Sequence, residues 1–167
     1  MGRAEMMQIT KERSYSFEGY FDAKEMYQVM KGYLEDHKHY DVSEKDLDEQ
    51  QHNGKRKIIA KFEAEQMFND YYKIVLKYSI TLTGKELEVE LDGVKRRLTE
   101  GKAELHINGF IKPDFMNKRE KGPLSEFFGK LYDKFFGRNE FNDCIFRAIG
   151  DINALLNTFK QQVNSKL

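Results

Sequence analysis

The sequence predicts a single α+β domain, spanning residues 1–167, in which helices cover an antiparallel β-meander. Two dipeptides, Asn53-Gly54 and Asp92-Gly93, indicate tight hairpins, because both central positions of such turns need a positive φ. The residues around these turns alternate between apolar and polar, which is typical of strands. Towards the C-terminus the apolar residues instead recur at helical spacing. We therefore expect the order β-α-β(5-6)-α-α.

The N-terminal part predicts one strand followed by one helix. Residues Ile9 to Tyr20 alternate as a strand does. Asp22 is a typical helix N-cap, and Glu25 stands three residues after it, as in a capping box. Apolar residues then follow at helical spacing, so the helix should extend from about Ala23 to His37.

The middle of the chain predicts the meander. Gly84 and Glu100-Gly101 predict two further turns, which gives five or six strands. The alternation predicts one apolar face and one polar, solvent-exposed face, as in an antiparallel sheet covered on one side. The predicted apolar face consists of Ile58, Ala60, Phe62, Ala64, Tyr72, Ile74, Leu76, Tyr78, Ile80, Leu82, Leu87, Val89, Leu91, Ala103, Leu105 and Ile107.

Two helices are expected after the meander. The first spans Leu124 to Phe136 and is bordered by Pro123 and Gly137. The second carries a long apolar stripe, which is the natural cover for the apolar face of the sheet. That stripe consists of Phe141, Ile145, Ala148, Ile149, Ile152, Leu155, Leu156, Phe159 and Val163.

This order of elements resembles the helix-grip fold of START-like lipid-transfer and polyketide-cyclase-like proteins, over nearly the whole chain. The resemblance implies a curved sheet that wraps the last helix and often encloses a cavity. The stretch from Asp70 through Gly84-Lys85-Glu86-Leu87-Glu88-Val89 to Leu131-Tyr132-Asp133-Lys134-Phe135 also resembles an archaeal protein family of the same layout and of unknown function. That second resemblance implies no activity.

Composition narrows the function classes. The 28 Lys and Arg residues balance the 28 Asp and Glu residues, whereas a nucleic-acid-binding protein usually has a basic excess. No apolar run approaches the ~20 residues of a membrane span, and the N-terminus lacks the apolar core of a signal peptide. Cys144 is the single cysteine, so an internal disulfide is impossible. We expect a cytoplasmic protein.

The residues that could take part in catalysis or metal binding are better explained by structural roles. His37 and His39 are two residues apart, a spacing that does not bring both to one face of a helix. Glu86, Glu88 and Glu90 form an acidic strand face that we expect to be solvated. The basic runs Lys55-Arg56-Lys57 and Lys95-Arg96-Arg97 flank the hairpin turns and are interpreted as protecting strand edges. We expect no catalytic residue, no metal site and no cofactor.

The predicted interior is almost wholly apolar, with only the Tyr72 and Tyr78 hydroxyls as polar groups. An enzyme cavity needs several convergent polar groups, so the sequence favours a non-enzymatic binding module over an enzyme. Its ligand would be an apolar small molecule, a lipid or a protein partner. The candidate ligand-binding residues are Phe62, Tyr72, Tyr78, Ile149 and Ile152.

Two alternatives remain open. Residues 111–138 hold seven Lys and Arg against four acids, together with several aromatic rings. A basic, aromatic helix can lie on a membrane or bind a partner, which would make the chain a peripheral membrane-surface or scaffold protein. The residues of that surface would be Phe127, Phe128, Lys130, Tyr132, Lys134 and Phe136. The second alternative is a cyclase- or hydrolase-like enzyme.

Overall fold

The computed structural model describes residues 6–113 and 137–164, and it confirms the α+β class. The predicted helix Leu124–Phe136, with its candidate partner or membrane surface, lies outside the described residues. The elements are β1 (Met7–Gln8), β2 (Arg13–Phe21), α1 (Ala23–Lys38), β3 (Asp41–His52), β4 (Lys55–Met67), β5 (Tyr72–Leu91), β6 (Val94–Pro113) and α4 (Gly137–Asn164).

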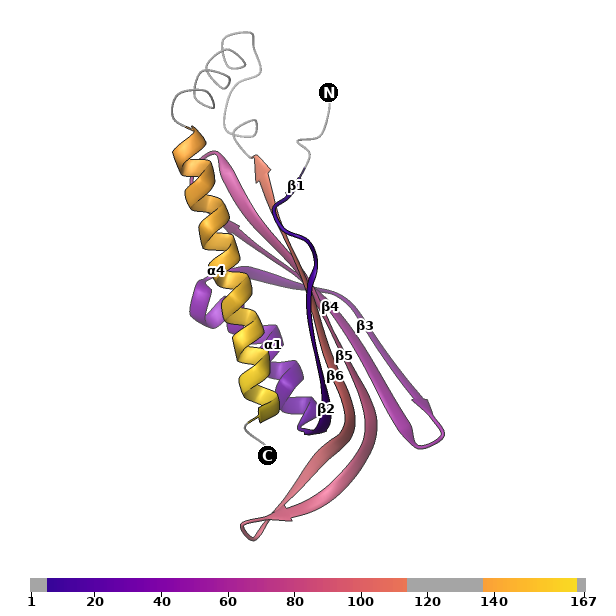
Figure 1. Cartoon of the computed structure of the whole chain (residues 1–167). Helices are drawn as coiled ribbons and strands as arrows, with labels where there is room; N and C mark the ends of the chain where they lie inside the picture. Colours follow the sequence, from indigo (N-terminus) through magenta and orange to yellow (C-terminus); the bar gives the residue numbers. More distant parts are fainter. Residues whose placement is uncertain (1–5, 114–136, 165–167) are drawn as a thin grey trace.

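All described strands belong to one antiparallel sheet of order β1-β6-β5-β4-β3, in which β2 also pairs with β6. Strands β3 to β6 form the meander, and β2 returns to pair with its last strand. Helix α1 therefore connects one edge of the sheet to the other. Figure 1 shows that α1 and α4 lie on the same side of the sheet, which we call the helix-covered face.

Capping hydrogen bonds mark both ends of helix α1. The Asp22 side chain accepts a hydrogen bond of 3.1 Å from the Glu25 amide, which confirms the predicted N-cap. At the other end His39 adopts a left-handed conformation, and the Tyr40 amide donates to the Leu34 carbonyl. The helix buries Met26, Met30 and Leu34.

Both predicted hairpin turns are confirmed. Asn53 and Gly54 have φ angles of 53° and 78°, and Asp92 and Gly93 have φ angles of 53° and 77°. These positive values are those of a type I′ turn, which matches the twist of the strands on either side.

The two further turns predicted at Gly84 and Gly101 are wrong. Gly84 and Gly101 pair with each other inside β5 and β6, which are each 20 residues long. The meander therefore has four strands rather than five or six. A Cβ atom at Gly101 would overlap the Thr83 carbonyl oxygen, so glycine is needed here for close backbone approach rather than for a turn.

Because the strands continue through this pair, the apolar pattern changes face. The register of β5 and β6 has no shift, so Leu82 and Leu87 point to opposite faces. The single apolar face predicted for the whole meander is therefore wrong beyond Gly84. Glu86 and Glu88 continue the helix-covered face there, while Leu87 and Val89 lie on the other face.

The core lies between the helix-covered face and the two helices. It is built from Phe62, Ile74, Leu76, Tyr78, Ile80, Leu82, Leu105, Ile107, Ile152, Leu155 and Phe159, among others. Ile152 is fully buried, and a Cβ atom at Gly109 would lie 2.8 Å from its Cδ1. The missing side chain of Gly109 thus lets α4 approach β6 closely. Ile149, predicted beside Ile152, is only partly buried.

Candidate functional site

Four of the five predicted ligand-binding residues belong to the core cluster. Phe62 and Tyr78 stack with ring centroids 5.0 Å apart, and the Tyr78 hydroxyl donates to the Met30 carbonyl at 2.8 Å. Tyr72 packs against Phe141 at 5.5 Å between centroids, and Ile152 of α4 is fully buried. The structure thus places these four side chains in one core, where Phe62 and Tyr78 contact each other directly.

A pocket of about 670 Å³ lies where this core ends. We call it the rim pocket. It is lined by Asp22, Ala23, Lys24, Glu25, Tyr27, Leu47, Glu49, Arg56, Ile58, Glu86, Arg96, Arg97, Leu98 and Thr99. These residues come from the N-terminal end of α1 and from β3, β4, β5 and β6. The volume is within the range of ~300–1,000 Å³ typical of small-molecule sites.

One wall of the rim pocket is apolar. Leu47 from β3 and Ile58 from β4 contribute to it, and the register places both on the helix-covered face. The Leu47 side chain is 50% exposed. An exposed leucine beside a pocket offers apolar surface that a ligand would remove from water.

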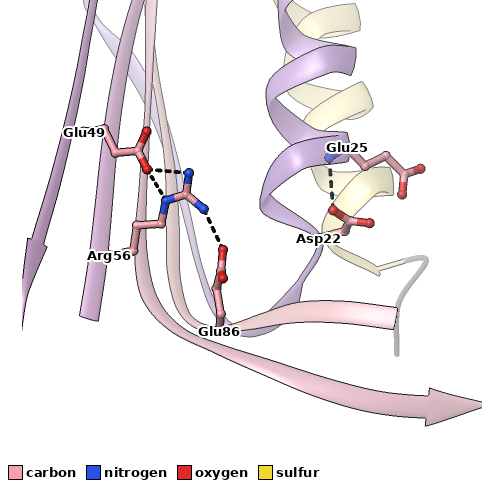
Figure 2. A network of polar contacts seen from close by, with 5 residues as sticks. All are labelled: Asp22, Glu25, Glu49, Arg56 and Glu86. Carbon is pink, nitrogen blue, oxygen red and sulfur yellow. Dashed lines mark hydrogen bonds and ion pairs between the residues drawn. The ribbon is translucent and has the colours of Figure 1, made fainter. Parts of the chain in front are cut away.

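The floor of the rim pocket holds an ion-pair network centred on Arg56, shown in Figure 2. The guanidinium pairs with Glu49 on β3, and its Nη1 donates to the Glu86 Oε1 on β5 at 2.6 Å. The hydrogen bond to Glu86 is the main reason that the pKa of Arg56 is raised. Since Gly84 is the residue opposite Arg56 and has no side chain, the guanidinium has room to reach Glu86.

Tyr27 connects the rim pocket to the core. Its hydroxyl donates to Glu44 at 2.5 Å, and this hydrogen bond raises the pKa of Tyr27 to about 12. Its ring lies 6.1 Å from that of Phe62. The Tyr27 side chain is therefore held by a hydrogen bond at its hydroxyl and by a ring contact with Phe62, and it lines the pocket.

The charged groups of the rim pocket differ in their ion pairs and hydrogen bonds. Glu49 and Glu86 are paired with Arg56, and Asp22 accepts the capping hydrogen bond from α1. In residues 6–113 and 137–164, by contrast, Arg96 and Arg97 take part in no ion pair or side-chain hydrogen bond. These two guanidiniums have hydrogen-bond donors available to a ligand.

The other residues considered from the sequence show no shared site. The His106 Nδ1 lies 3.5 Å from Glu12, His39 forms the end of α1, and the His37 ring packs on Tyr33. Burial raises the pKa of Cys144 to about 12, which makes its thiol a poor nucleophile. Within the described part of the chain, no group of three or more His, Cys, Asp or Glu residues could hold a metal ion.

The rim pocket is not predicted from the sequence. Arg56, Arg96 and Arg97 are expected there only as edge protection, and β3 is not predicted because its residues Asp41–His52 are almost all polar. One signal was present: a hairpin at Asn53-Gly54 requires a strand before it, and Leu47 is the large apolar residue at its centre.

No protein-family model matches the sequence, and no curated protein is significantly similar to it. Of the two helices that the structure describes, neither has the length and apolar character that crossing a membrane requires.

Proposed function

We propose that this chain is a non-enzymatic binding module of helix-grip type, and that it holds a small, largely apolar molecule in the rim pocket. The observation that supports this most directly is the pocket of about 670 Å³ at the end of the core, with Leu47 half exposed on its wall. The strand order supports the helix-grip assignment, since β2 pairs with the last strand of a meander covered by α4.

The rim pocket supports a ligand better than the predicted interior residues do. Phe62 and Tyr78 stack on each other, and Ile152 is fully buried in the same core. A ligand among these residues would have to displace packed side chains. At the rim pocket the same sheet face continues, but the helices no longer cover all of it. A ligand there gains apolar contact without disturbing the core.

Binding rather than catalysis fits the polar groups of the rim pocket. Its fourteen lining residues include neither histidine nor cysteine. Its carboxylates Glu49 and Glu86 are occupied by Arg56, and general acid-base work needs carboxyl groups whose environments separate their pKa values. The network instead holds β3, β4 and β5 in fixed positions around the pocket.

Binding of the apolar fluorophore N-phenyl-1-naphthylamine tests this proposal. We expect saturable fluorescence enhancement, with an affinity weakened about five- to tenfold in Leu47→Ser because apolar contact is lost. Val94→Ser is the matched control, because Val94 is 55% exposed and does not line the rim pocket. Absence of saturable binding, or equal loss in both variants, would refute the proposed site.

A further inference from the structure

We infer that the ligand of the rim pocket carries one acidic group, and that Arg96 and Arg97 on β6 bind this group. The inference rests on the proposed function and deepens it, because it names the chemical class of the ligand as an apolar molecule with a carboxylate, sulfonate or phosphate.

Arg56 is not available to a ligand. Glu49 and Glu86 take up its guanidinium from two sides, and an arginine with two carboxylate partners has little capacity for a third anion. Displacing either carboxylate would also break a side-chain ion pair between β4 and a neighbouring strand. The ligand therefore has to use other donors.

The N-terminal end of α1 is likewise occupied. Helix N-termini attract anions through their unpaired amides, but here the Asp22 carboxylate already accepts from the Glu25 amide. The carboxylate also places negative charge at this end of the helix. A second anion is therefore disfavoured at the Asp22 side of the pocket.

Arg96 and Arg97 are the remaining guanidiniums of the rim pocket. They are neighbours on β6, so the strand alternation places them on opposite faces, yet both line the pocket. The pocket thus reaches residues on both faces of β6. Between Val94 and Leu98, β6 has no strand partner other than β5 among the described residues, which leaves this side of the strand open to a ligand.

The strand order separates the apolar wall from these arginines. Leu47 lies on β3 and Ile58 on β4, whereas Arg96 and Arg97 lie on β6, with β5 between. A ligand that spans the pocket would touch apolar surface at one end and two guanidiniums at the other. This arrangement fits a molecule that is apolar at one end and acidic at the other, since guanidinium binds planar anions with paired hydrogen bonds.

Two fluorophores of nearly the same shape test the inference. Anilinonaphthalene sulfonate has the apolar body of N-phenyl-1-naphthylamine plus one sulfonate. We expect the double variant Arg96→Gln/Arg97→Gln to weaken the sulfonate probe about five- to tenfold and the neutral probe less than about twofold. Raising the salt concentration should weaken only the sulfonate probe.

Lys85→Gln/Lys95→Gln is the control, because it removes the same number of positive charges from β5 and β6 without changing a residue that lines the rim pocket. It should leave both affinities within about twofold of the parent. If the arginine variant affects both probes equally, or neither, the acidic ligand is refuted while the apolar site stands. If neither probe binds to the parent, the proposed function itself fails.

Discussion

Strands β5 and β6 form two regions of this protein that share one hydrogen-bond ladder. The two regions differ in their neighbouring strands and in whether the helices cover them. From Tyr72 to Leu82, β5 lies between β4 and β6 and is covered by the helices. Beyond Gly84, β4 no longer pairs with it, and β2 follows β6 only as far as Thr99. The ribbon of residues 85–100, which is two-stranded beyond the Glu86–Thr99 pair, projects beneath the helices in Figure 1, and we call it the arm.

The boundary between the two regions is a row of glycines. Gly19 on β2, Gly101 on β6 and Gly84 on β5 are direct neighbours across three strands. Without side chains, the backbones approach closely, and the face that carried Leu82 carries Glu86 next. Backbone pairing between β5 and β6 therefore continues beyond the helix-covered core. An isolated two-stranded ribbon is marginally stable, so the arm depends on the contacts at its base.

The largest difference should come from truncating one side chain in each region. Ile152→Ala should lower the free energy of unfolding by about 2–5 kcal/mol, because it leaves a cavity in the covered region. Val94→Ala in the arm should change it by less than about 0.5 kcal/mol, because Val94 is 55% exposed. Urea denaturation measures both. Equal losses would show that the arm is as cooperative a part of the fold as the core.

A Cβ atom at the boundary should have the next largest effect. Gly101→Ala should destabilise by about 1–3 kcal/mol, because the methyl group would overlap backbone atoms of Thr83 and Gly84. Gly150→Ala is the matched control: no atom lies within 4 Å of its Cβ position in α4, so alanine should stabilise by about 0.5–1 kcal/mol. Thermal melts that shift in the same direction would contradict the close approach at the glycine row.

Alkaline pH should weaken the covered region specifically. Burial raises the pKa values of Tyr40 and Tyr78 above the ordinary 10.0, so both stay protonated in the folded state while the unfolded chain loses these protons. Stability is therefore fully present below pH 10 and falls as the pH rises, by about 1.4 kcal/mol per pH unit for each tyrosine.

Urea denaturation at pH 9, 10 and 11 measures this fall, which should be less steep in Tyr78→Phe. The variant loses the hydrogen bond to the Met30 carbonyl at every pH, so the slope rather than the absolute stability is the readout. The arm carries no tyrosine, so it adds nothing to this slope. An unchanged slope in Tyr78→Phe would mean that Tyr78 titrates normally.

The smallest effect should come from the ion pair at the base of the arm. Arg56→Gln removes exposed pairs with Glu49 and Glu86, each worth about 0.2–1 kcal/mol, so the melting temperature should change little. Hydrogen exchange of residues 85–100 should nevertheless become faster, because Glu86 no longer ties the arm to β4. Lys57→Gln, the neighbouring change on β4, should leave exchange in the arm as it is.

The turns, the helix cap and the apolar stripe of α4 follow from the sequence, because each depends on residues close together in the chain. Asn53-Gly54 and Asp92-Gly93 form the predicted turns because their φ preference is local. Asp22 caps α1 for the same reason, since its partner is three residues away. The apolar stripe of α4 also follows from spacing alone, and Ile152, Leu155 and Phe159 are buried as that spacing requires.

The roles of the strand glycines and of the arginines depend on contacts between segments that are distant in the sequence. A glycine in a strand and a glycine in a turn look alike in the sequence, and Gly84 and Gly101 differ from Gly54 only in the backbone that lies across from them. Likewise, Arg56 meets Glu86 because β4 and β5 pair in one register, 30 residues apart along the chain. The rim pocket is built from five elements, and its existence depends on their mutual placement, which no local pattern encodes.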